Sequence, residues 1–124
     1  MSGSLVSGTD ARVWGLVRLA GDLRARGHYK GALGALDVAW HLGPGERAEL
    51  ALYASATAIH CDRGDYKRAL KLERSFRDRG IDLRLALAFQ RLHFELFTVT
   101  GIERYRERLD FYRAVVGLLD AGAA

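Results

Sequence analysis

Three segments recur at intervals of 37 residues: Gly27-His28-Tyr29, Gly64-Asp65-Tyr66 and Gly101-Ile102-Glu103. Each lies between two stretches whose apolar residues have helical spacing, so each marks the turn of a helical hairpin. One hairpin cannot bury its apolar face alone, and neighbouring copies must therefore stack on one another. The sequence predicts an all-α fold of three antiparallel helical hairpins, six helices in all.

Apolar residues at three- and four-residue steps give the expected helix bounds. These are Ala11–Arg26, Tyr29–Leu42, Glu46–Arg63, Tyr66–Arg79, a fifth helix that begins after Asp82, and Ile102–Leu119. Thr9 or Asp10 is expected to cap the first helix, and Gly43-Pro44-Gly45 to end the second. We expect a flexible leader (1–10), one domain (11–120, with repeats at approximately 13–46, 50–83 and 87–120) and a tail (121–124).

The same spacing predicts which side chains face the core. Leu16, Leu19, Ala20 and Leu23 are expected inward on the first helix, and Trp40 inward on the second. The fifth helix is apolar on two sides, since Leu85, Phe89, Leu92 and Leu96 form one seam and Leu83, Leu87, Phe94 and Phe97 another, so it should be sandwiched. Trp14 could anchor a partner, or it could pack under the Gly/Ser leader or against the second helix, and both readings stay open.

Composition excludes several classes of function. A single cysteine, Cys61, rules out an intramolecular disulfide and a cysteine-based zinc site, and the four histidines show no metal-ligand spacing. His60 and His93 are read as core residues. We therefore expect no metal ion, no cofactor and no enzymatic activity. No run of about eighteen apolar residues is present, so membrane insertion is not expected and the protein is expected to be cytoplasmic.

The formal charge of +4 does not favour a nucleic-acid partner. Basic residues are frequent between Arg63 and Arg84, but acids are interspersed among them, and nucleic-acid surfaces usually carry a denser basic stripe. Arg91 and Glu95 are four residues apart on the fifth helix, and an intrahelical ion pair is the simplest reading of that spacing.

The first repeat resembles the tetratricopeptide repeat family. Leu16, Leu19, Ala20 and Leu23 stand where the motif has Trp, Leu, Gly and Tyr, and Ala32, Leu36 and Pro44 occupy later signature positions. The second repeat matches at Tyr53, Ala56, Thr57, His60 and Ala69, but Glu73 replaces a large apolar residue. The third repeat keeps only the spacing, because Arg106 and Asp110 stand where the family has Ala and Phe. The resemblance implies a right-handed superhelix.

The resemblance also implies that the first helix of each hairpin lines a concave groove that binds a helical segment of another protein. The residues placed there are Trp14, Val17, Gly21 and Arg24, then Ala51, Ala54, Ala58 and Cys61, then Ala88, Arg91, Glu95 and Thr98. Val17 and Gly21 fall where family members that grip a terminal carboxylate need lysine and asparagine, so that partner class is not expected. In size, repeat number and groove character the chain is similar to bacterial type III secretion chaperones.

Three other readings remain open at this stage. The exposed flank of the last helix could mediate self-association into an oligomeric scaffold. The basic helix at Tyr66–Arg79 could make the chain a regulatory protein that touches nucleic acid. The groove could also serve as the pocket of an enzyme or a small-molecule sensor, although no convergent polar residues point to one.

Overall fold

The structure, a computed structural model, describes residues 2–76 and 80–123, with side chains for residues 9–76 and 80–122. These residues form six helices and no strand. The helices are α1 (Ser2–Ala25), α2 (Tyr29–His41), α3 (Glu46–Asp62), α4 (Tyr66–Ser75), α5 (Leu83–Thr100) and α6 (Glu103–Ala123). The all-α prediction is confirmed for this part of the chain. No described helix combines the length and the apolar character that crossing a membrane requires.

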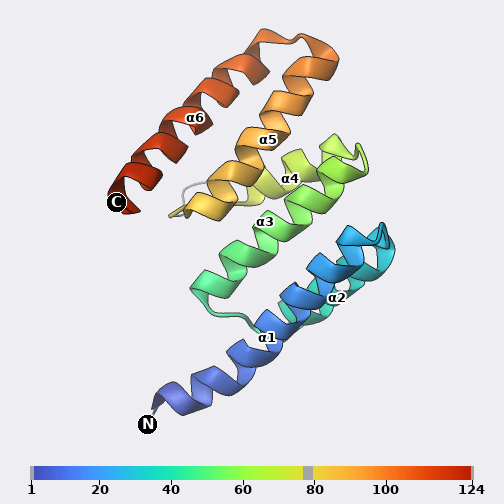
Figure 1. Ribbon diagram of the computed structural model, residues 1–124, viewed down its shortest axis with the longest axis vertical. Coiled ribbons are helices and arrows are strands. Elements are labelled where there is room, and N and C mark those ends of the chain that lie inside the picture. Colours follow the sequence, from blue (N-terminus) through green and yellow to red (C-terminus); the bar gives the residue numbers. More distant parts are fainter. Residues whose placement is uncertain (1, 77–79, 124) are drawn as a thin grey trace.

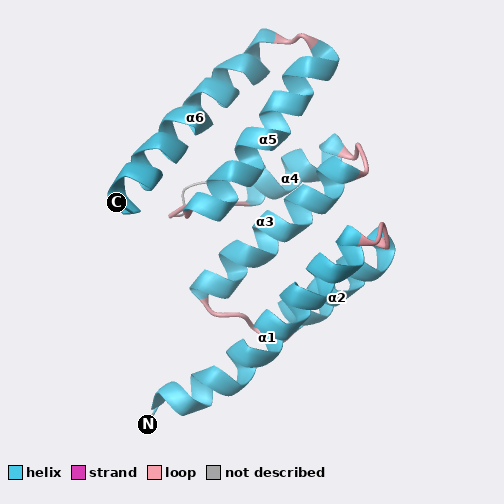
Figure 2. Ribbon diagram, in the orientation of Figure 1, coloured by secondary structure: helices cyan, strands magenta, loops and turns pink. Residues whose placement is uncertain are grey.

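The helices form three successive hairpins along the long axis of the molecule (Figure 1). Helix α1 packs on α2, α3 on α4, and α5 on α6. Between hairpins, α3 packs on both α1 and α2, and α5 packs on both α3 and α4. Helix α3 is thus the central element, and short loops join α1 to α2, α2 to α3, α3 to α4 and α5 to α6 (Figure 2).

The recurring glycines make the turns within the hairpins. Gly27, Gly64 and Gly101 have φ angles of +78°, +71° and +68°. A side chain at such a left-handed position would be strained, whereas glycine adopts it freely. The 37-residue interval is therefore the repeat of one backbone conformation that ends the first helix of each hairpin.

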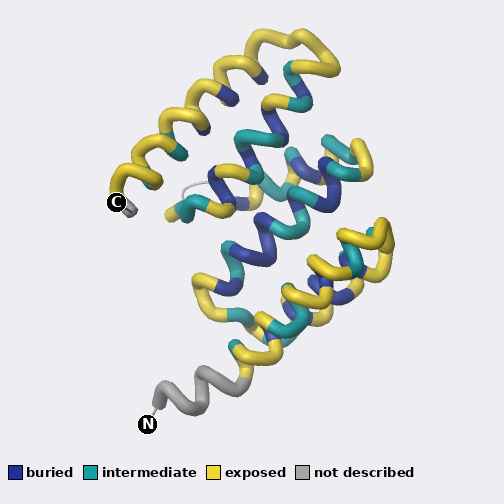
Figure 3. Tube along the Cα trace, viewed as in Figure 1, coloured by how far each residue is buried: buried dark blue, intermediate teal, exposed yellow. Residues whose placement is uncertain are grey.

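Two clusters of buried side chains form the core between the helices. Figure 3 marks the buried positions along the chain. One joins α1, α2 and α3 around Val13, Leu36 and Ile59. The other joins α3 to α6 around Phe89 and Leu92. A row of ring contacts spans the hairpins, with centroid distances of 5.1 to 6.2 Å; it runs from Trp40 through Tyr53, Phe76 and Phe89 to Tyr112. Edge-on and tilted contacts of this kind stabilise a core beyond its buried area.

Several predicted boundaries differ from the structure. Helix α1 begins at Ser2, so Thr9 and Asp10 lie inside it and do not cap it. No proline interrupts residues 2–10, and a helix extends readily once its first turn exists. Residue 1 of the predicted leader and residue 124 of the predicted tail lie outside the described residues, as does the predicted end of the fourth helix at Arg79. Helix α6 continues to Ala123, four residues beyond its expected end.

Three predictions of burial were wrong. Leu19 is 46% exposed, and Trp40 is 42% exposed although its ring contacts Tyr53 of α3, so that contact covers only part of the Trp40 side chain. Helix α5 is covered by α3, α4 and α6, yet Leu87 and Phe94 of its second seam are 45% and 51% exposed. The histidine predictions are confirmed, since both His60 and His93 are buried.

Candidate functional site

An open groove lies where α1, α3 and α5 meet, and we refer to it as the α3–α5 groove. Its volume is about 600 Å³. The lining residues are Arg24 of α1, Ala54, Ser55 and Ala58 of α3, and Leu83, Arg84, Leu87, Ala88 and Arg91 of α5. The α3 floor is made of small side chains, and the exposed Leu87 stands at its edge.

A chain of charged contacts crosses this groove and connects all three hairpins. Asp62 at the end of α3 accepts hydrogen bonds from Arg24, at 2.5 Å from Nε and 3.1 Å from Nη2. The same carboxylate lies 2.8 Å from Nη2 of Arg91. Arg91 Nε in turn donates to Glu95 at 2.6 Å, and the Tyr66 hydroxyl donates to Glu95 at 3.1 Å. The expected pair between Arg91 and Glu95 is confirmed as one link of this chain.

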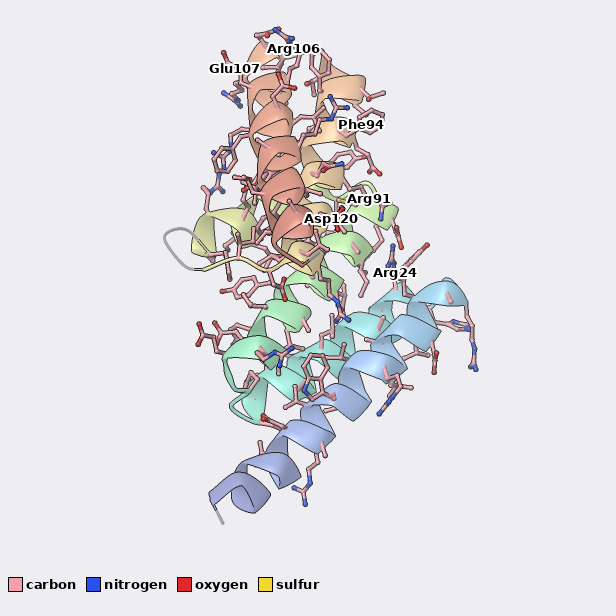
Figure 4. All side chains as sticks on the ribbon, turned by 60° about the vertical axis from the view of Figure 1, so that its left-hand side comes forward. Arg24, Arg91, Phe94, Arg106, Glu107 and Asp120 are labelled. Carbon is pink, nitrogen blue, oxygen red and sulfur yellow. The ribbon has the colours of Figure 1, made fainter. Side chains whose placement is uncertain are left out.

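The hydrogen bonds and ion pairs of this chain of contacts favour the charged form of Asp62. The hydrogen bond from Arg24 lowers the pKa of Asp62, and this effect together with Arg91 outweighs the opposing effect of burial. Arg24 and Arg91 are about one-third exposed, so both remain open to further contacts. Figure 4 shows Arg24, Arg91 and Phe94 following one another along one side of the molecule.

The structure brings together some of the residues predicted to bind a partner. Arg24, Ala54, Ala58 and Arg91 line the groove, and Glu95 is attached to it through Arg91. Ala88, which the family register also placed there, lines it too.

The remaining predicted residues lie elsewhere. Ala51 and Cys61 are buried and do not line the groove. Val17 packs against the core of the first hairpin, and Gly21 is exposed on α1. Trp14 is 37% exposed and is not among the groove residues. Burial raises the pKa of the Cys61 thiol to about 11, so it is not a thiolate at neutral pH.

A second cavity, which the sequence did not indicate, lies between α4 and α6 over α5. This α4–α6 cavity has a volume of about 890 Å³. Its charged and polar lining residues are Glu73, Arg74, His93, Arg104, Tyr105, Glu107, Arg108 and Tyr112, and the apolar ones include Phe76, Phe89 and Phe111. Arg108 lies 4.9 Å from the ring centre of Phe111 and 5.0 Å from that of Tyr112, and such stacking orients a guanidinium.

Glu73 is the centre of a polar cluster in this cavity. Its Oε1 accepts a hydrogen bond from His93 Nε2 at 2.8 Å, and its Oε2 accepts from the Tyr112 hydroxyl at 2.5 Å and from Arg108 Nη2 at 3.1 Å. Helices α4 and α6 do not pack directly on each other. The carboxylate therefore links α4 to both helices of the third hairpin. We refer to Glu73, His93, Arg108 and Tyr112 as the Glu73 cluster.

The Glu73 cluster is suited to holding helices rather than to acid–base chemistry. Burial raises the pKa of Glu73, but the hydrogen bonds from His93, Tyr112 and Arg108 outweigh it and leave the pKa below its ordinary value. Burial and the bond to Glu73 raise the pKa of Tyr112. Both groups consequently keep one protonation state near neutral pH, whereas general catalysts need a pKa near the working pH.

One signal in the sequence pointed toward this cluster. Glu73 occupies a position where the repeat motif has a large apolar residue, and a carboxylate at a core position needs partners. Its partners are 20, 35 and 39 residues further along the chain, so local spacing could not identify them. Among the described residues, no group of three His, Cys, Asp or Glu side chains could hold a metal ion.

Comparisons of this chain with protein-family models, with curated proteins and with solved structures found no match.

Proposed function

We propose that this chain is a non-enzymatic protein-binding adaptor or chaperone of tetratricopeptide-repeat type. In this proposal an amphipathic helical segment of a partner lies in the α3–α5 groove. The proposal rests on the groove itself, which has a floor of small side chains beside the half-exposed Leu87, and on the half-exposed Phe94 two turns further along α5. Small residues let a second helix approach closely, and covering the two large side chains removes apolar surface from water.

The arrangement of the helices supports a repeat architecture. The first helices of successive hairpins pack side by side, α1 on α3 and α3 on α5, and the second helices α2 and α4 each pack on the first helix of their own hairpin and on that of the next. The glycine turns repeat every 37 residues. We propose a right-handed superhelix of three divergent repeats, in which the α3–α5 groove is part of the concave face. A bacterial secretion chaperone that acts in the cytoplasm is the most specific form of this proposal.

The test is affinity purification of tagged protein from its native cells, followed by mass spectrometry, with wild type compared to Ser55→Arg. Ser55 is half-buried on the floor, so an arginine would fill the groove with little effect on the core. Ala114→Arg, on the exposed side of α6, is the matched control. We expect a stoichiometric partner that Ser55→Arg loses and Ala114→Arg keeps. A partner retained by Ser55→Arg would remove the groove from the proposal, provided that circular dichroism shows both variants folded.

A second candidate function is an oligomeric scaffold that assembles through α6. Phe111 is 51% exposed and Leu118 is 75% exposed on that helix, and large apolar side chains seven residues apart lie on the same helical face. Analytical ultracentrifugation should then detect an oligomer that Leu118→Glu dissociates. A protein that is monomeric at about 100 μM would have a dimer dissociation constant above that concentration, which corresponds to little free energy of association. This result would exclude the oligomeric scaffold.

A further inference from the structure

Four residues of α5 form a single strip that runs along the α3–α5 groove and continues past it to Phe94, which does not line the groove. Arg84, Leu87, Arg91 and Phe94 follow a three-four-three spacing, so they fall on one face of the helix. Leu87 and Phe94 are both about half exposed. Arg84 and Arg91 are seven residues apart, as are Leu87 and Phe94, which corresponds to about 10 Å along a helix. The strip therefore has the repeat of a helix-packing seam in which apolar and basic positions alternate.

Every charged side chain that lines the groove is an arginine: Arg24, Arg84 and Arg91. Asp62 and Glu95 balance two of them through the contacts described above. Arg84 is exposed and pairs with no carboxylate among the described residues. The groove consequently has an excess of positive charge beside its apolar strip.

We propose that the segment bound in this groove is an acidic amphipathic helix, which rests on the function proposed above. Its apolar residues cover Leu87 and Phe94. Carboxylates about seven residues apart meet Arg84 and Arg91, because the two arginines have the same spacing on α5. Electrostatic complementarity of this kind selects among partners and fixes the register of a bound helix.

The composition of the strip favours a helix over nucleic acid as the occupant. A phosphate backbone would contact the arginines but would leave Leu87 and Phe94 uncovered or pressed against charge. A helix with an apolar stripe and acidic flanks can cover Leu87 and Phe94 with the stripe and place its carboxylates beside the arginines.

Two 21-residue helical peptides with the same leucine stripe provide the probe. One carries glutamates at heptad positions beside the stripe and the other carries lysines at the same positions. Fluorescence anisotropy at low and moderate salt gives the affinities. We expect the acidic peptide to bind about tenfold more tightly, since several partly exposed ion pairs together reach that range. Arg84→Glu should reduce this preference, whereas Arg113→Glu, on the exposed surface of α6, should leave it unchanged.

The outcomes separate this inference from the function on which it rests. If both peptides bind equally and Ser55→Arg abolishes both, the groove binds helices but the acidic preference is wrong. If neither peptide binds, or if Ser55→Arg has no effect, the groove is not a helix-binding site and the proposed function falls as well. If a labelled single-stranded oligonucleotide binds and displaces the acidic peptide, the occupant is nucleic acid and the inference is overturned.

Discussion

Replacing Glu73 by alanine should destabilise the fold strongly, because one carboxylate satisfies donors from two other helices. The substitution leaves His93 Nε2 and the Tyr112 hydroxyl without their acceptor, and both residues are buried. Arg108 is about half exposed and can turn toward water. Each buried donor left unpaired costs about 1–3 kcal/mol, so the total should be about 3 kcal/mol. For a chain of this size, that loss lowers Tm by roughly 10 °C.

The effect of Glu73 also has a predicted pH dependence. The pKa of Glu73 in the folded protein is below its ordinary value of 4.5. Because folding lowers this pKa, the ionised carboxylate stabilises the native state at pH values above its ordinary pKa. This stabilisation is lost as the pH falls through the pKa that Glu73 has in the folded protein. The difference in unfolding free energy between wild type and Glu73→Gln should be constant above about pH 5 and shrink below about pH 4.5.

Urea unfolding followed by circular dichroism measures these differences. Glu107→Ala is the control, since Glu107 lines the same cavity but is exposed on α6 (Figure 4), and its unfolding free energy should stay within about 0.5 kcal/mol of wild type. Tyr112→Phe removes the hydrogen bond that the hydroxyl donates to Glu73 and the one that it accepts from Arg108, which can turn toward water, and should cost about 1 kcal/mol. If Glu73→Ala is as stable as Glu107→Ala, the Glu73 cluster does not hold the third hairpin and the reasoning is refuted.

Three further substitutions or modifications test other parts of the structure. Asp62→Asn should lower the unfolding free energy by about 1 kcal/mol, because two arginines lose a charged acceptor. Urea unfolding should show a smaller loss of unfolding free energy at high salt, and a loss that does not depend on salt would contradict the electrostatic cause. Thr57→Val should be neutral or stabilising by up to about 1 kcal/mol, since the buried Thr57 hydroxyl has no hydrogen-bond partner among the described residues. A clear drop in Tm would show that the hydroxyl makes a hydrogen bond in solution. Cys61 should react with a thiol reagent at pH 8 far more slowly in the folded protein than in urea, because it is buried and its pKa is about 11; equal rates would place the thiol at the surface.

Local sequence chemistry was enough to predict the helices and their turns. Glycine at the ends of α1, α3 and α5 terminates helices because it adopts left-handed φ angles. Asp82 caps α5 as expected, accepting a hydrogen bond from the Leu85 amide at 2.9 Å. Four of the residues predicted to bind a partner, Arg24, Ala54, Ala58 and Arg91, line the groove.

The exposure of individual side chains and the partners of Glu73 depend on contacts between hairpins, which the periodicity of the sequence does not specify. The apolar pattern placed Leu19 and Trp40 inward, but it cannot say which flank of a helix the next hairpin covers. In the same way Glu73 stood out as an unusual residue, yet its acceptor role becomes visible only when α5 and α6 are in place. The first turns of α1 were missed because serine and glycine have weak helix propensity, which neighbouring turns can override.

The position of Asp62 has a consequence for cooperativity. Among the described residues, no helix of the first hairpin packs on a helix of the third. In an array with contacts only between neighbours, a terminal hairpin can unfold while the far one stays intact. Asp62 contacts Arg24 on one side and Arg91 on the other, so the unfolding of either terminal hairpin removes one of the two positive charges that pair with this carboxylate. The stabilities of the two ends of the molecule are thereby coupled through a side chain that belongs to neither.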